Sequence, residues 1–231
     1  MHFSGRPGRT TTDALQYLVY KIKDAWRQGK VTSILFLDVE GAFPNVVSDR
    51  LIHNLRKHKI PSIYIKLIWK ILEGKKTRLK FNDFVLELID ICNGIGQGNP
   101  LSMILYVIYN TDLLDMLALL EGEDSIGYVN DAITIAFSED FYVTMQTLEW
   151  MMNREDGGFT WSCTHNSLFE ISKLTMLHAS RCTQLDPANP RKRTALDRLP
   201  LWLQDKTVKE VDSYKYLGVH VDSQLWWTVQ A

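Results

Sequence analysis

The apolar segment VTSILFLDV, residues 31–39, is the feature that most constrains the fold of this chain. It is rich in β-branched and large apolar residues and has the length of a buried β-strand. An acidic residue, Asp38, stands near its end, and the turn-forming sequence GAFPNV follows. A carboxylate in this position either caps its own turn or faces a functional site, and the segment alone leaves both interpretations open.

A second acidic turn is predicted within GYVNDAITIAF, residues 127–137. The pattern is typical of a β-hairpin in which Asn130 and Asp131 form the turn. Between the two acidic segments, GIGQGNPLS at residues 94–102 is rich in glycine and opens a helix predicted through residue 120. Taken alone, each segment favours an ordinary turn or helix start. Together they predict a phosphoryl-transfer site, because carboxylates from two adjacent strands can hold a pair of Mg²⁺ ions.

The remaining pattern mixes helices and strands and predicts an α+β fold, a small antiparallel sheet with helices on one face. Thr11 or Thr12 is expected to cap the first helix, which Gly29 ends. A hairpin over residues 77–91 is expected to turn at Asn82–Asp83. The other expected elements are helices at 48–58, 62–74 and 140–155, a strand within 159–180, a basic loop at 186–200 and a final hairpin at 209–223.

Composition says more about the cellular compartment of the protein than about its binding partner. The net charge of −1 neither indicates nor excludes nucleic acid, because binding depends on local basic surfaces. The basic run at residues 191–193 is interpreted as part of a solvated loop. The three widely spaced cysteines predict no disulfide framework or zinc site, which fits a reducing compartment, the nucleus or the cytoplasm. No apolar run has the length of a membrane span or signal peptide, so we expect neither membrane insertion nor secretion.

Six segments together resemble the motifs of reverse transcriptases. FLDVEGAFPNV, GIGQGNPLS and YVND resemble the three catalytic motifs, the last of which reads aromatic-x-Asp-Asp in the family. RPGRTTTDAL, FEISKLTMLHAS and YKYLGVHVDSQLWW resemble the upstream fingers motif, the lysine-bearing motif and the primer-grip region. The order is kept from about Gly5 to Trp227. The resemblance is to retrotransposons without long terminal repeats, and the Ala-Phe-Pro variant is similar to fungal members.

The resemblance implies a polymerase palm with partial fingers and little or no thumb. Residues 1–30 are expected to be a fingers segment, residues 31–185 the palm, and residues 186–231 the basic loop and a primer-grip-like hairpin. The chain has no room for an endonuclease or ribonuclease H domain, so we expect a fragment or decayed copy whose partners include the missing fingers, thumb and endonuclease segments of a full element.

The implied activity is RNA-directed DNA polymerisation, in which deoxynucleoside triphosphates extend a DNA primer on an RNA template. By resemblance, Asp38, the backbone carbonyl of Val39 and Asp131 hold Mg²⁺, with Mn²⁺ as a substitute. Lys173 is expected near the departing phosphates, where a cation or general acid is useful. The alternative for Lys173 is an ordinary solvated charge.

The resemblance also assigns the nucleotide-binding residues. Phe43 stands where the family keeps a bulky gate against a ribose 2′-hydroxyl, and its alternative is a core aromatic. Gln97 is expected under the incoming nucleotide and the template base, and Gly98 is expected to allow close backbone approach. Arg6 or Arg9 is expected to reach the triphosphate, with simple exposure as the alternative.

The third motif departs from the family at Asn130, which occupies the position of the first Asp. In the family that Asp is a direct metal ligand. Asn keeps the shape and one carbonyl oxygen but removes a full negative charge, which predicts weaker metal binding and impaired catalysis. The alternatives are a catalytically inactive polymerase-fold relic that at most binds nucleic acid, and an unrelated α/β structural domain.

Overall fold

A five-stranded sheet forms the centre of the protein, whose computed structural model describes residues 1–227. Every residue of its central strand is buried, as the apolar run predicts. Neighbouring strands are antiparallel except for the edge strand β13, which runs parallel to β8. The strand order is β13 (Lys209–Val211), β8 (Thr175–Ala179), β1 (Val31–Leu37), β7 (Asp131–Ser138) and β6 (Glu123–Tyr128).

Three helices cover one face of this sheet: α4 (Pro100–Leu117), α5 (Phe141–Asn153) and α6 (Gly158–Thr164). Alternate residues of a strand point to opposite faces, so Leu35 and Leu37 of β1 enter the apolar cluster formed with these helices. The expected α+β fold with a mainly antiparallel sheet is confirmed, but helices do not cover one face alone, because α1 (Thr11–Arg27) packs on the other face. Helix α6 was not predicted from the sequence.

The opposite face is covered by α1 (Thr11–Arg27) and by the hairpin of β14 (Ser213–Tyr216) and β15 (Val219–Asp222). Ile34 and Phe36 of β1 pack into this second cluster. Helix α1 begins with a capping box in which the Thr10 hydroxyl accepts from the Asp13 backbone and the Asp13 carboxylate accepts from the Thr10 backbone. The predicted cap at Thr11 or Thr12 was therefore wrong by one or two residues.

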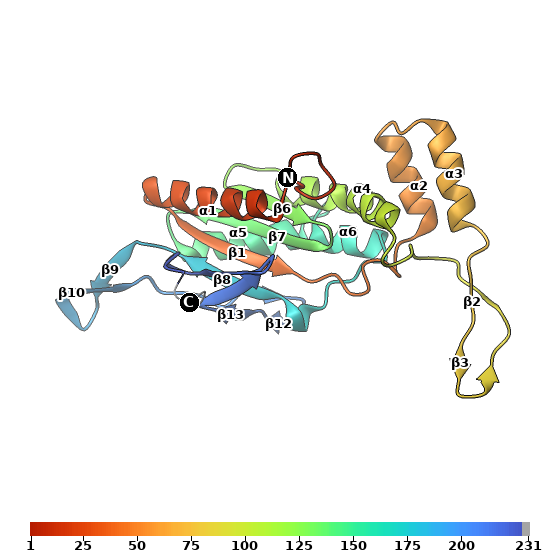
Figure 1. Ribbon diagram of the computed structural model, residues 1–231. Coiled ribbons are helices and arrows are strands. Elements are labelled where there is room, and N and C mark those ends of the chain that lie inside the picture. The colour runs from red at the N-terminus through yellow and green to blue at the C-terminus, as the bar shows by residue number, and fades with distance from the viewer. Residues whose placement is uncertain (228–231) are drawn as a thin grey trace.

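A lobe extends from one end of the sheet (Figure 1). It contains two packed helices and two short ribbons, and the turn predicted at Asn82–Asp83 is confirmed by the pairing of Phe81 with Phe84. The elements of the lobe are α2 (Ser48–Lys57), α3 (Ser62–Leu72), β2 (Lys76–Thr77) paired with β5 (Ile89–Asp90), and β3 (Lys80–Phe81) paired with β4 (Phe84–Val85).

The basic segment predicted as a loop at residues 186–200 is mostly an antiparallel ribbon of β9 (Thr183–Asp186) and β10 (Asn189–Ala195). Figure 1 shows it projecting from the end of the sheet opposite to the α2–α3 lobe. The loop prediction was wrong because proline and charged residues are tolerated in an exposed ribbon that has no buried face. A small hairpin, β11 (Trp202–Leu203) with β12 (Lys206–Thr207), follows. Within the described residues, no helix is both long and apolar enough to cross a membrane.

Candidate active site

The two acidic residues of the sequence prediction meet at one end of the sheet. Leu37 pairs with Ala132 in the antiparallel β1–β7 ladder. Asp38 directly follows this pair on one strand and Asp131 directly precedes it on the other. The predicted hairpin turn needs correction, because Tyr128 pairs with Asp131 and the turn residues are therefore Val129 and Asn130. Asp131 is held in the first position of β7 and not in a turn.

Electrostatics at this point favour a bound cation. Burial raises the pKa of the Asp131 carboxyl above its usual range, and the negative charge of Asp38 raises it further. Two neighbouring carboxylates repel each other when both are ionised, so a cation between them restores the ionised form. Oxygen ligands of this kind suit hard divalent cations such as Mg²⁺.

A lysine supplies one such charge from the chain itself. The short 3-10 helix Ile171–Lys173 places the Lys173 ammonium 3.6 Å from the Asp38 carboxylate and against the Glu170 carboxylate. The Glu170 backbone N–H donates to the Asp38 carbonyl oxygen at 3.2 Å, which fixes this segment beside β1. The hydrogen bond with Glu170 is the main cause that raises the pKa of Lys173. The structure thus places Lys173 beside Asp38.

Sequence reasoning missed Glu170. The signal available was its spacing of three residues before Lys173, which places an acid and a base on neighbouring positions of a helical turn. Val39 lies on the other side of this segment, where it forms an isolated antiparallel bridge with Phe169. Residues 169–173 are therefore held next to Asp38 and Val39 by backbone contacts.

The Val129–Asn130 turn is held in an uncommon conformation. Val129 has a φ of 56°, which is unfavourable for a β-branched residue. Its backbone N–H donates to the Ser4 hydroxyl at 2.9 Å, and its carbonyl accepts from the Asn110 side chain at 3.3 Å. Asn110 is fully buried in α4. These contacts fix the position of Asn130 next to Asp131.

A cavity of about 460 Å³ adjoins Asp131. Phe43, Gly98, Asn130 and Asp131 line it, so four of the predicted site residues share one space. The Phe43 ring also packs against Tyr106 with the ring centroids 5.1 Å apart, which means that its packing and gating roles are compatible. Gly98 has a φ of 87°, a conformation that glycine adopts without strain.

Three predicted nucleotide-binding residues do not line this cavity in the described part of the chain. Gln97 is exposed. Arg6 is exposed, and the Arg9 guanidinium lies 5.7 Å from the centroid of the Phe3 ring. The structure therefore brings together the acidic pair, Asn130, Lys173, Phe43 and Gly98, and leaves these three at other positions.

Tyr214 and Tyr216 of β14 lie near the acidic pair on the face of the sheet that α1 covers, and they were not predicted as site residues. The Tyr214 ring stacks on Phe36, with the centroids 3.9 Å apart. Burial raises the pKa of Tyr214, and the negative charges of Asp131 and Asp38 add to this effect. The hairpin that resembles the primer grip thus lies against β1, the strand that Asp38 directly follows.

The oxygen atoms at this site suit a divalent cation, but the side chains supply few ligands. Asp38 and Asp131 supply two anionic side chains, and Asn130 adds at most an uncharged oxygen. Across residues 1–227 there is no group of three or more His, Cys, Asp and Glu side chains that could hold a metal ion. An Asp at position 130 would add a third carboxylate at this place.

The sheet, the paired carboxylates at its end and the adjacent lysine define a polymerase palm. A telomerase from Candida tropicalis lacking its C-terminal domain shares this fold with a TM-score of 0.61 at 12% identity, over 94% of this chain and 39% of that chain. Another apo telomerase structure from the same organism matches with a TM-score of 0.58 at 10% identity, over 94% of this chain and 35% of that chain.

Sequence comparison specifies the class further. The family model described as reverse transcriptase (RNA-dependent DNA polymerase) matches residues 2–221, and the chain belongs to this family. The probable RNA-directed DNA polymerase from transposon X-element of Drosophila melanogaster is 24% identical, over 96% of this chain and 23% of that protein. The retrovirus-related Pol polyprotein from type-1 retrotransposable element R2 of Nasonia vitripennis is 25% identical, over 87% and 19%. The chain thus spans less than a quarter of the length of these relatives.

Proposed function

We propose that this chain is the palm-centred part of the reverse transcriptase of a retrotransposon without long terminal repeats. It extends a DNA primer with deoxynucleoside triphosphates on an RNA template. The observation that carries this proposal is the pairing of Leu37 with Ala132, which makes Asp38 and Asp131 neighbours at the end of a polymerase palm. The mobile-element relatives support the assignment to this group of retrotransposons.

The acidic pair and the backbone carbonyl of Val39 hold Mg²⁺ in this proposal. When bound, paired Mg²⁺ ions activate the primer 3′-hydroxyl and stabilise the pyrophosphate that leaves. Lys173 lies beside Asp38, from where its ammonium offers a positive charge or a proton to the departing phosphates. Glu170 pairs with Lys173, which keeps the ammonium group protonated and oriented.

The cavity beside Asp131 receives the incoming nucleotide. Phe43 limits the space next to the sugar, and Gly98 lets the backbone approach the base. Gln97, Arg6 and Arg9 contact the base pair and the triphosphate only if the loops that carry them move toward this cavity.

The proposed organisation follows the motif order. Residues 1–30 belong to the fingers, residues 31–185 to the palm, and residues 186–231 to the end of the palm with a primer-grip-like hairpin. The partners are the fingers, thumb and endonuclease segments of a longer element, and the setting is the nucleus or cytoplasm.

We further propose that Asn130 impairs catalysis, since it leaves only two carboxylates for the metal ions. The second candidate function, an inactive palm that only binds nucleic acid, rests on the same residue and on the absence of a third acidic ligand among residues 1–227. Primer extension separates the two. A chain carrying fingers and thumb segments of a related polymerase is assayed with Mg²⁺ and with Mn²⁺, beside its Asp38→Asn variant. Extension that Asp38→Asn abolishes supports a polymerase, while salt-sensitive primer–template binding without extension supports the inactive palm.

A further inference from the structure

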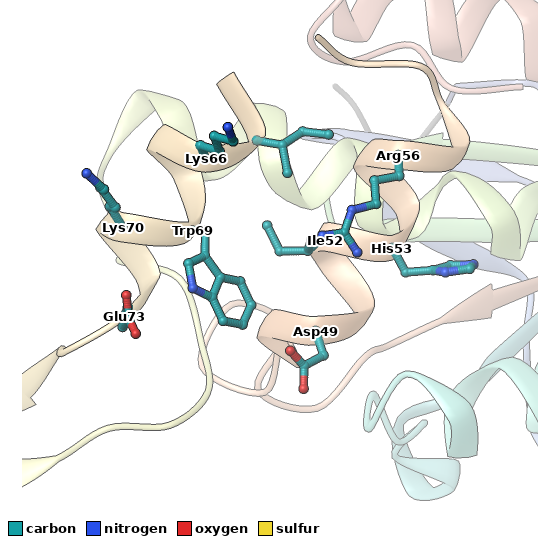
Figure 2. A pocket seen from close by; sticks show the side chains of 9 residues that line it. Asp49, Ile52, His53, Arg56, Lys66, Trp69, Lys70 and Glu73 are labelled. Carbon is teal, nitrogen blue, oxygen red and sulfur yellow. The ribbon is translucent and has the colours of Figure 1, made fainter. Parts of the chain in front are cut away.

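A second cavity, of about 730 Å³, lies between α2 and α3 and shares no lining residue with the cavity beside Asp131. Its apolar wall includes Ile52 and Ile65, which are both buried. Figure 2 shows the Trp69 indole of α3 and the Arg56 guanidinium of α2 projecting into the space between the two helices. Trp69 is 38% exposed, so a large part of its ring is available to a ligand.

The lobe that holds this cavity is basic in an otherwise balanced protein. Residues 48–90 contain ten lysines and arginines and five acidic residues, whereas the whole chain has a net charge of −1. Two of the acidic residues, Asp49 and Glu73, also line the cavity. Charge concentrated on one lobe creates a local positive potential that attracts polyanions. The rest of the chain has a net excess of acidic residues.

The cations around the cavity are available for binding. Among the described residues, Arg56, Lys66 and Lys70 have no carboxylate within 4.0 Å, although all three line the cavity. Arg78 and Lys80 are exposed further along the same lobe. A phosphate backbone releases counterions when it meets such a row of basic side chains, which makes binding favourable and sensitive to salt.

We propose that the α2–α3 cavity binds an unpaired strand of nucleic acid, with one base stacked on Trp69 and the adjoining phosphates on Arg56 and Lys66. An aromatic ring flanked by cations suits a single strand of nucleic acid. A base can stack on the ring, and the neighbouring phosphates can pair with the cations. A base inside a duplex is already stacked on its neighbours and cannot enter a space between two helices. The site binds this strand whether or not the carboxylates at Asp38 and Asp131 catalyse.

Fluorescence anisotropy of labelled oligonucleotides of about 12 nucleotides tests the proposal. Single-stranded RNA, single-stranded DNA and a DNA duplex are titrated with the whole chain in EDTA, so that the metal site does not contribute. Trp69→Ala should weaken binding of either single strand by roughly 5- to 150-fold, and Trp69→Phe should restore most of it. The matched control is Trp150→Ala on α5, which removes another exposed tryptophan, 56% exposed, outside the basic lobe and should have no effect.

Two further measurements complete the test. Arg56→Ala should weaken binding at low salt and reduce the slope of affinity against salt by about one ion. An oligonucleotide containing 4-thiouridine should crosslink to peptides of α2 or α3. The proposal is overturned if Trp69→Ala binds as tightly as Trp150→Ala, if the duplex binds more tightly than the single strands, or if the crosslinks lie outside this lobe. Asp38→Asn should leave this binding unchanged, so a failed polymerase assay and a failed strand-binding assay are separate results.

Discussion

Asn130 offers the sharpest test of the catalytic proposal, because its replacement by Asp changes one charge and almost no volume. The residue lies in the Val129–Asn130 turn, which Ser4 and Asn110 hold in place next to Asp131. A new carboxylate should therefore join the acidic pair without rearranging the backbone. A metal-neutralising carboxylate contributes several kcal/mol to transition-state stabilisation, and each ~1.4 kcal/mol is tenfold in rate. We expect Asn130→Asp to raise primer extension roughly a thousandfold.

The assay is single-turnover primer extension with Mg²⁺, on the chain joined to fingers and thumb segments that grip a primer–template. Mn²⁺ should partly rescue the unmodified chain, because it accepts poorer ligand sets than Mg²⁺ does. Asp38→Asn in the Asn130→Asp background should remove the gain. Robust Mg²⁺-dependent extension by the unmodified chain would refute the reasoning, as would an Asn130→Asp variant no faster than its parent.

Three other predictions follow from the same structure. Phe43→Ala should reduce discrimination against ribonucleotides by at least roughly tenfold in an active version of the protein, and unchanged sugar selectivity would make Phe43 a packing residue only. Glu170→Gln should lower the pKa of Lys173, so the alkaline limb of the rate profile should move to lower pH, and an unmoved limb would separate Lys173 from catalysis. Burial lowers the pKa of His178 to about 4, so protonation favours the unfolded chain. Its contribution to stability should fall by about 2 kcal/mol between pH 7 and pH 5, and His178→Phe should remove that part of the pH dependence of urea unfolding.

The central strands could be predicted because a run of apolar residues directly indicates a buried strand. The run at residues 31–37 is apolar or β-branched apart from Ser33, and all of it is buried. In β7, residues 132–136 are likewise all buried and mostly apolar. The exposed β9–β10 ribbon has no such apolar pattern, because neither of its faces packs against the core. Helix α6 begins at Gly158, directly after Gly157, and has only seven residues, which is too short for periodicity to reveal it.

The candidate site was predictable where it depends on strand ends and less so where it depends on loops. The two acidic strand ends were expected on adjacent strands because a metal pair requires converging carboxylates, and the β1–β7 register places Asp38 beside Asp131. The turn was misplaced by one residue because Val129 adopts a positive φ that its side chain disfavours, and only the tertiary contacts of Ser4 and Asn110 explain this. Glu170 was missed for a related reason, since its partnership with Lys173 depends on a short 3-10 helix.

Anomalous scattering from a crystal soaked in Mn²⁺ tests the metal site most directly. We expect a peak about 2.0–2.3 Å from carboxylate oxygens of both Asp38 and Asp131, with the Lys173 ammonium displaced from Asp38, and a stronger peak in the Asn130→Asp protein. A Mn²⁺ peak at another group of ligands, with Asp38 still paired to Lys173 and no ion beside Asp131, would contradict the assignment of this acidic pair as the metal site of a polymerase.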